Sequence, residues 1–183
     1  MTLADWFEKG MTPQAYIDAM SVNKEQLQSI YERFQVNDEE EAQFKQLKSK
    51  KLRAIVLTED WCGDAMVNVP ILLKIAEKAD IDVRMLLRDQ NLELMDQYLT
   101  NGTARAIPIF IFIDEAGNEQ AVWGPRAPEV QLLVDEGRSK LPPKDASNYA
   151  DKQKELYAAF NRRFTTDEQL WTNIYNSIME KLK

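Results

Sequence analysis

The chain has 183 residues, of which 44% are hydrophobic and 29% are charged, and its formal net charge is −7. This composition predicts one soluble domain with a sizeable core, and the scattered basic residues argue against nucleic acid or an anionic membrane as a partner. The chain has no histidine and one cysteine, Cys62, which excludes an intrachain disulfide and a cysteine-only zinc site and removes the commonest metal ligand and general base. We therefore expect neither a metal nor a cofactor.

The first fifty residues have apolar side chains at helical spacing. A helix is expected after Thr12, which can cap it, with Pro13 at the first helical position. Apolar residues between positions 27 and 34 repeat as they do in a helix that packs on one face. Residues 1–51 are therefore predicted to form an N-terminal helical extension packed on the core.

The pattern changes at Leu52, where short apolar runs begin to alternate with helical segments. In chain order the sequence predicts a buried strand at 52–58, a helix at 63–79, a strand at 81–87, a helix at 92–99, a core strand at 109–113, a turn at 115–118, a strand at 119–123 and a helix at 127–140. This order predicts an α/β domain over residues 52–140.

Residues 141–183 are predicted to be a linker and a C-terminal helical tail. Leu141-Pro142-Pro143 ends the preceding helix. The segment Thr165-Thr166-Asp167-Glu168 has the spacing of a capping box, and it is followed by an apolar stripe that we expect to cover the core of the same domain.

The segment Met1–Trp6 has no basic stretch followed by an apolar run, and no segment approaches membrane-spanning length. We expect a cytoplasmic protein, since thiols stay reduced there, and no membrane partner. The sequence carries no signal for the oligomeric state.

Cys62 follows a predicted buried strand and precedes a predicted helix. The free N–H groups and the dipole of a helix start favour thiolate over thiol. Glu59, Asp60 and Asp64 oppose this effect, because nearby carboxylates favour the neutral thiol. The balance predicts a modestly acidic thiol, and we expect Asp64 to be a solvated residue of the first helical turn.

Three features in this region resemble thioredoxins. Trp61-Cys62-Gly63 is similar to the tryptophan, attacking cysteine and glycine of the thioredoxin active site, Pro70 matches the proline within the active-site helix, and Ile107-Pro108 matches the loop with the cis-proline. The resemblance implies a thioredoxin-like fold: a central mixed sheet flanked by helices, here with extra helical segments at both termini.

The resemblance also implies a set of site residues. Cys62 would be the catalytic nucleophile. Trp61, Ile107 and Pro108 would form an apolar lip that binds substrate, and Gly63 would let backbone approach the sulfur.

The chain departs from thioredoxins at two positions. Ala65 stands where thioredoxins have a second, resolving cysteine, and Val56 stands where they have a buried acidic residue that helps this second thiol to ionise. Both changes remove the step in which the second thiol releases the substrate.

Three hypotheses about function remain open. The first is a monothiol thiol-disulfide oxidoreductase or redox-adduct carrier, whose partners are a disulfide-containing protein or a low-molecular-weight thiol and whose mixed disulfide is resolved by an external thiol. The second is a redox-inactive binding or scaffold protein with the same fold. The third is an iron-sulfur carrier that uses Cys62 together with an external thiol.

Overall fold

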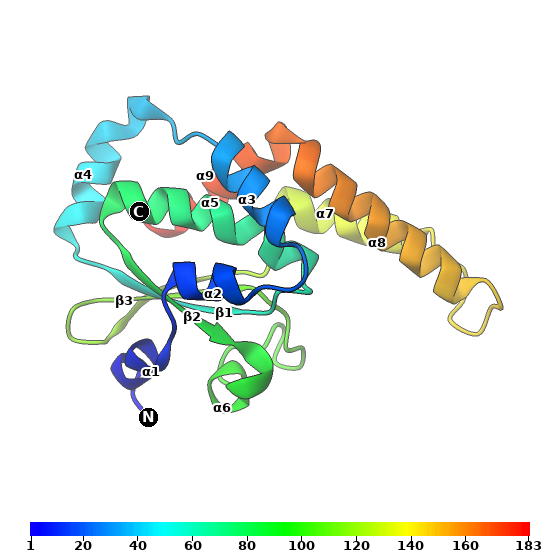
Figure 1. The fold of residues 1–183 in the computed structure, drawn as a ribbon, viewed down its shortest axis with the longest axis horizontal. Helices are drawn as coiled ribbons and strands as arrows, with labels where there is room; N and C mark the ends of the chain where they lie inside the picture. The colour runs from blue at the N-terminus through cyan, green and yellow to red at the C-terminus, as the bar shows by residue number, and fades with distance from the viewer.

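A computed structural model describes residues 1–183, and a four-stranded mixed sheet lies at its centre (Figure 1). The strands are β1 (Arg53–Thr58), β2 (Asp82–Leu87), β3 (Ile109–Ile113) and β4 (Glu119–Trp123), in the spatial order β2-β1-β3-β4. Strand β1 pairs in parallel with β2 and antiparallel with β3, and β3 pairs antiparallel with β4. The predicted central mixed sheet is therefore confirmed.

Helices cover both faces of the sheet. They are α1 (Leu3–Lys9), α2 (Pro13–Ala19), α3 (Lys24–Arg33), α4 (Glu41–Ser49), α5 (Gly63–Ala79), α6 (Leu92–Met95), α7 (Pro128–Ser139), α8 (Tyr149–Thr166) and α9 (Glu168–Lys181), with 3-10 turns at Asp38–Glu40 and Arg88–Gln90. Figure 1 shows α1 and α6 on one face, α5 with its neighbouring helices on the other, and α7 and α8 extending together to one end of the molecule. No helix combines the length and apolar character that crossing a lipid bilayer requires.

The alternation of side chains along the strands divides the core into two clusters. On β3, Phe110 and Phe112 point into the larger cluster beneath α5, whereas Ile109, Ile111 and Ile113 point into the smaller cluster beside α1 and α6. All five side chains are at most 3% exposed. A strand buried on both faces has to be apolar throughout, which explains why its bounds could be predicted from the sequence.

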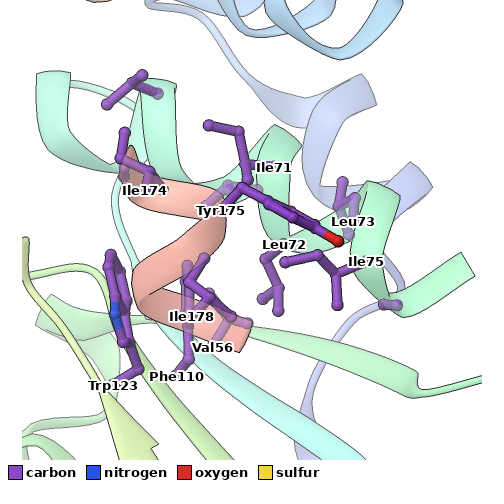
Figure 2. Packing of buried hydrophobic residues seen from close by; sticks show 14 of the residues in the cluster. Val56, Ile71, Leu72, Leu73, Ile75, Phe110, Trp123, Ile174, Tyr175 and Ile178 are labelled. Atoms are coloured by element: carbon purple, nitrogen blue, oxygen red, sulfur yellow. The ribbon is translucent and has the colours of Figure 1, made fainter. Parts of the chain in front are cut away.

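Helix α9 completes the larger cluster, as its apolar stripe predicts. Ile174 and Ile178 of α9 are fully buried, and they pack with Ile71 and Leu72 of α5 above Val56 of the sheet (Figure 2). The apolar residues of α2, α3 and α4 join the same cluster. The helical segments at both termini therefore share one core with the sheet.

The N-terminal region also covers an edge of the sheet. The Thr12 side chain accepts a hydrogen bond from the Ala15 N–H at 3.1 Å, as expected for the cap of α2. Just before this cap, Met11 forms two backbone hydrogen bonds with Met85 of β2, at 2.9 and 2.8 Å. Because β2 is the last strand on its side of the sheet, this short pairing closes part of an open edge.

Two local predictions were wrong. Helix α6 ends at Met95, well before the expected end at residue 99, and turns follow it. The start of α9 is capped by Asp167, which accepts hydrogen bonds from the N–H groups of Gln169 and Leu170, and not by a threonine. Thr165 and Thr166 lie in the last turn of α8, where their hydroxyls donate to carbonyl groups one turn earlier.

Candidate functional site

The Cys62 thiol joins the start of α5 to the loop that precedes β3. Cys62 is the N-cap residue of α5, and its Sγ accepts a hydrogen bond from the Ala65 N–H at 3.5 Å. The thiol donates to the carbonyl oxygen of Ile107, also at 3.5 Å. These contacts place the sulfur at the amino end of a 17-residue helix, where a thiolate would accept from free backbone N–H groups.

The loop facing the thiol contains Ile107 and Pro108, and the peptide bond between them is cis. Both side chains are buried, with Ile107 packed in the smaller core cluster. The Ile107 backbone N–H has no hydrogen-bond acceptor within the chain. The loop thus contacts Cys62 through its backbone, while its two side chains are buried.

The residues on either side of Cys62 have different surroundings. Trp61 is 50% exposed, and the guanidinium of Arg88 lies over its ring at 4.9 Å from the centroid. Gly63 lies directly beneath Asn161 of α8, so that a Cβ at position 63 would collide with the Asn161 side-chain oxygen. Trp61 therefore offers a flat exposed surface, whereas Gly63 permits α8 to pack close to the thiol.

Asp64 is not the solvated residue that we expected. Its carboxylate accepts two hydrogen bonds from Arg126, at 3.0 and 2.7 Å, and both side chains are less than 15% exposed. Arg126 also donates to Gln131 at 3.1 Å. The Asn68 side chain, which is fully buried, donates to the Pro125 carbonyl oxygen at 3.0 Å and fixes the same loop to α5. Tertiary packing therefore draws Asp64 out of water.

The other two carboxylates near Cys62 each accept a hydrogen bond from the backbone of a neighbouring loop. Glu59 accepts a hydrogen bond from the Asp89 N–H at 2.9 Å, and Asp60 accepts from the Ser21 N–H at 2.8 Å. Of the charges near the thiol, that of Asp64 raises the Cys62 pKa most.

Burial, and after it the charge of Asp64, raise the pKa of the Cys62 thiol, which is about 11 once all contributions are included. Hydrogen bonds from the Ala65 and Asp64 N–H groups and the charge of Arg126 act in the opposite direction. The prediction of a modestly acidic thiol was therefore wrong. It weighed the helix start against nearby charges, but it left out the desolvation of the sulfur, which is the largest contribution.

A cavity of about 310 Å³ opens beside the thiol, between the start of α5 and helices α7 and α8. The residues that α7 and α8 contribute are Val134, Arg138, Tyr157, Phe160, Asn161 and Phe164. None of these residues is predicted as a site residue from the sequence. The aromatic positions 157, 160 and 164 have the spacing of one helix face, which could have identified α8 as amphipathic, but no local pattern shows that this face packs beside Cys62.

The position of a second thiol is apolar and closed. Ala65 is 1% exposed and Val56 is fully buried in the larger cluster. No group of three or more cysteine, aspartate or glutamate side chains converges in a way that could hold a metal ion. Any thiol chemistry at this site therefore has to use Cys62 and groups supplied by another molecule.

Comparison with known proteins places the chain in a family. A family model described as Thioredoxin matches residues 10–138. The chain belongs to the thioredoxin family. The matched region begins before α2, so it includes helices that precede the first strand as well as the thioredoxin-like strands and α5. None of the curated proteins compared with the chain matches it.

Two solved structures are similar to this thioredoxin-family chain over nearly their whole length. A protein of unknown function from Pseudomonas aeruginosa is 13% identical, with a TM-score of 0.65 over 96% of this chain and 98% of its own. An HIV epitope-scaffold is 15% identical, with a TM-score of 0.61 over 96% of this chain and 99% of its own. At these identities the similarity establishes the thioredoxin-like fold, including the terminal helices, and no activity.

Proposed function

We propose that this protein is a one-thiol member of the thioredoxin family that carries a partner thiol as a mixed disulfide on Cys62. The observation that carries the proposal is the position of the Cys62 sulfur. It lies at the start of α5, 3.5 Å from the Ile107 carbonyl oxygen, and it lines a cavity that a small molecule can enter. No second thiol is present to displace what the sulfur binds.

The proposed reaction has two exchange steps. Cys62 loses its proton to solvent, and the thiolate attacks a disulfide R–S–S–R′. A bond forms between Cys62 and one sulfur, the original S–S bond breaks, and the other half leaves as a thiolate that takes up a proton. An external low-molecular-weight thiol R″–SH then attacks the R sulfur of the mixed disulfide, so that R leaves as R–S–S–R″ and Cys62 is released as a thiolate that takes up the proton of the attacking thiol. The R′ sulfur is thereby reduced and the R″ sulfur is oxidised, and a compartment with reduced thiols, such as the cytoplasm, supplies the external thiol.

The raised pKa of Cys62, to about 11, favours a carrier over a fast reductase. At neutral pH roughly one thiol in ten thousand is ionised at this pKa, so attack by Cys62 is slow. Once the mixed disulfide has formed, Cys62 is also a poor leaving group, because thiols of lower pKa leave faster. The first effect slows the formation of the adduct, and the second lengthens its life.

The first test exposes the native protein to the disulfide of 2-mercaptoethanol at pH 8 to 9 and follows its intact mass. We expect one hydroxyethylthio group to be added at Cys62 and to be removed again by free 2-mercaptoethanol. The Cys62→Ser variant is the matched control, since it keeps a hydroxyl in place of the thiol and should gain no mass. Absence of the adduct until the protein is denatured would refute the proposal.

A binding protein without redox chemistry is the second candidate, and the same raised pKa favours it. In that case the Ile107 backbone and the cavity hold a partner without a covalent bond, and Cys62→Ser should keep the partner bound. The reversible adduct on native Cys62 separates the two candidates, because a site used for non-covalent binding alone does not require it.

A further inference from the structure

The cavity beside Cys62 has the size of a small-molecule site. Its volume of about 310 Å³ corresponds to roughly ten water molecules and lies at the lower end of the range for small-ligand pockets. Apolar side chains form most of its wall: Trp61, Val134, Tyr157, Phe160 and Phe164. A small molecule joined to the Cys62 sulfur could therefore be enclosed here, whereas a folded protein could not enter.

The charges of the side chains that line the cavity do not sum to zero. Asp64 and Arg126 neutralise each other in their largely buried ion pair. Arg138, an exposed residue in the last turn of α7, also lines the cavity, and its guanidinium forms no ion pair and no hydrogen bond within the chain. The charge of Arg138 lowers the pKa of Asp64, so this guanidinium acts on the site across the cavity. The lining thus has one unpaired positive charge in a protein whose net charge is −7.

A free amide accompanies this positive charge. Asn161 of α8 lies over Gly63, and its side-chain amide makes no hydrogen bond within the chain. An amide can both donate and accept, so it suits a polar group close to the sulfur. The cavity therefore presents a thiol, an amide and an unpaired guanidinium, with apolar surface between them.

We propose that this cavity selects small disulfides that carry a carboxylate, and that Arg138 binds the carboxylate of the half that becomes attached to Cys62. The inference rests on the proposed function, because it names the class of thiol that Cys62 carries. The exchange is Cys62–S⁻ + R–S–S–R → Cys62–S–S–R + R–S⁻, in which R contains the carboxylate and the released thiolate is protonated by water. Arginine suits this role because its planar guanidinium can form two parallel hydrogen bonds with a carboxylate.

The test compares three symmetric disulfides of similar size: those of 3-mercaptopropionate, 2-mercaptoethanol and cysteamine, which are anionic, neutral and cationic. The rate of adduct formation on Cys62 is measured by intact mass at low ionic strength. Each rate is divided by the rate with the same protein in urea, which removes the intrinsic reactivity of the disulfide. We expect the anionic probe to exceed the cationic one by about tenfold and to lose this advantage in high salt.

Two variants locate the source of this preference. Arg138→Gln should abolish it. Arg162→Gln is the matched control, because Arg162 is an exposed arginine of α8 that does not line this cavity and its loss changes the net charge equally. Equal normalised rates for the three probes would overturn the inference while leaving the proposed function standing, and so would an equal effect of the two variants. No adduct with any probe would overturn the proposed function itself.

Discussion

Replacing Asp64 with asparagine should make the Cys62 thiol more acidic. The change keeps the shape of the side chain and removes a negative charge that raises the Cys62 pKa. It also leaves the positive charge of Arg126 without its partner, and that charge lowers the same pKa. Both consequences favour the thiolate, so the direction of the change is determined.

Its size follows from the position of the charge. Two unit charges about 4 Å apart interact by about 1 kcal/mol in bulk water and by about 4 kcal/mol at an effective dielectric constant of about 20. Cys62 is partly exposed, and we therefore take a value near the lower limit, about 1.4 kcal/mol, which corresponds to a tenfold change in the thiolate fraction. At pH 8, iodoacetamide should accordingly alkylate the Asp64→Asn variant about ten times faster than the wild-type protein.

The assay is the alkylation rate between pH 7 and pH 11, followed by intact mass. Asp151→Asn is the matched control, because it removes an equal charge from an exposed position in the first turn of α8 and should leave the rate unchanged. Arg126→Met should slow alkylation. A folded Asp64→Asn protein, with near-UV circular dichroism like the wild type, that reacts at the wild-type rate or more slowly would refute this account of the site.

Three further predictions concern the free energy of unfolding, measured in urea. Gly124 has a φ of 130°, and a Cβ added there would collide with the Pro108 carbonyl oxygen. Gly124→Ala should therefore lower the free energy of unfolding by about 2 to 3 kcal/mol. A loss below about 0.5 kcal/mol would contradict this geometry. Ile178→Ala, at a fully buried position of α9, should cost about 2 to 5 kcal/mol. Leu132→Ala on α7, where the side chain is 69% exposed, should cost much less, and equal costs would show that α9 is not part of the core. Folding raises the pKa of Cys62 to about 11 from about 8.5 in an unfolded chain. The neutral thiol therefore makes its full contribution to the free energy of unfolding below about pH 8.5, and this contribution is lost as the pH rises toward 11. The difference in stability between wild type and Cys62→Ser should change over this interval, and a constant difference would argue against the raised pKa.

The sequence predicts the sheet and α5 well because their signals are local. The bounds of β3 and β4 agree with the prediction, since an apolar run, a turn and a second short run can be identified without knowledge of the rest of the chain. Helix α5 starts at Gly63 and ends at Ala79, as its apolar spacing predicts. The position of Cys62 at the start of this helix follows directly.

The electrostatics of the site could not be predicted in the same way. The pKa of Cys62 depends on how far packing removes the sulfur from water, and part of that packing comes from α8, about one hundred residues later in the chain. Asp64 gives a similar case, since its partner Arg126 is 62 residues away in sequence. The sequence of the segment around Cys62 does not indicate either contact. A prediction from that segment alone therefore had the wrong direction for the Cys62 pKa.

The pairing of Met11 with Met85 also bears on how the protein behaves at high concentration. An uncovered edge strand offers free N–H and C=O groups to any other extended chain, and proteins that leave such an edge open are prone to join edge to edge. Here two backbone hydrogen bonds, at 2.9 and 2.8 Å, occupy Met85 near the middle of β2. The segment that leads into α2 therefore protects β2 from pairing with the edge strand of another molecule. A shortened chain that begins after Met11 would lose this protection and aggregate more readily.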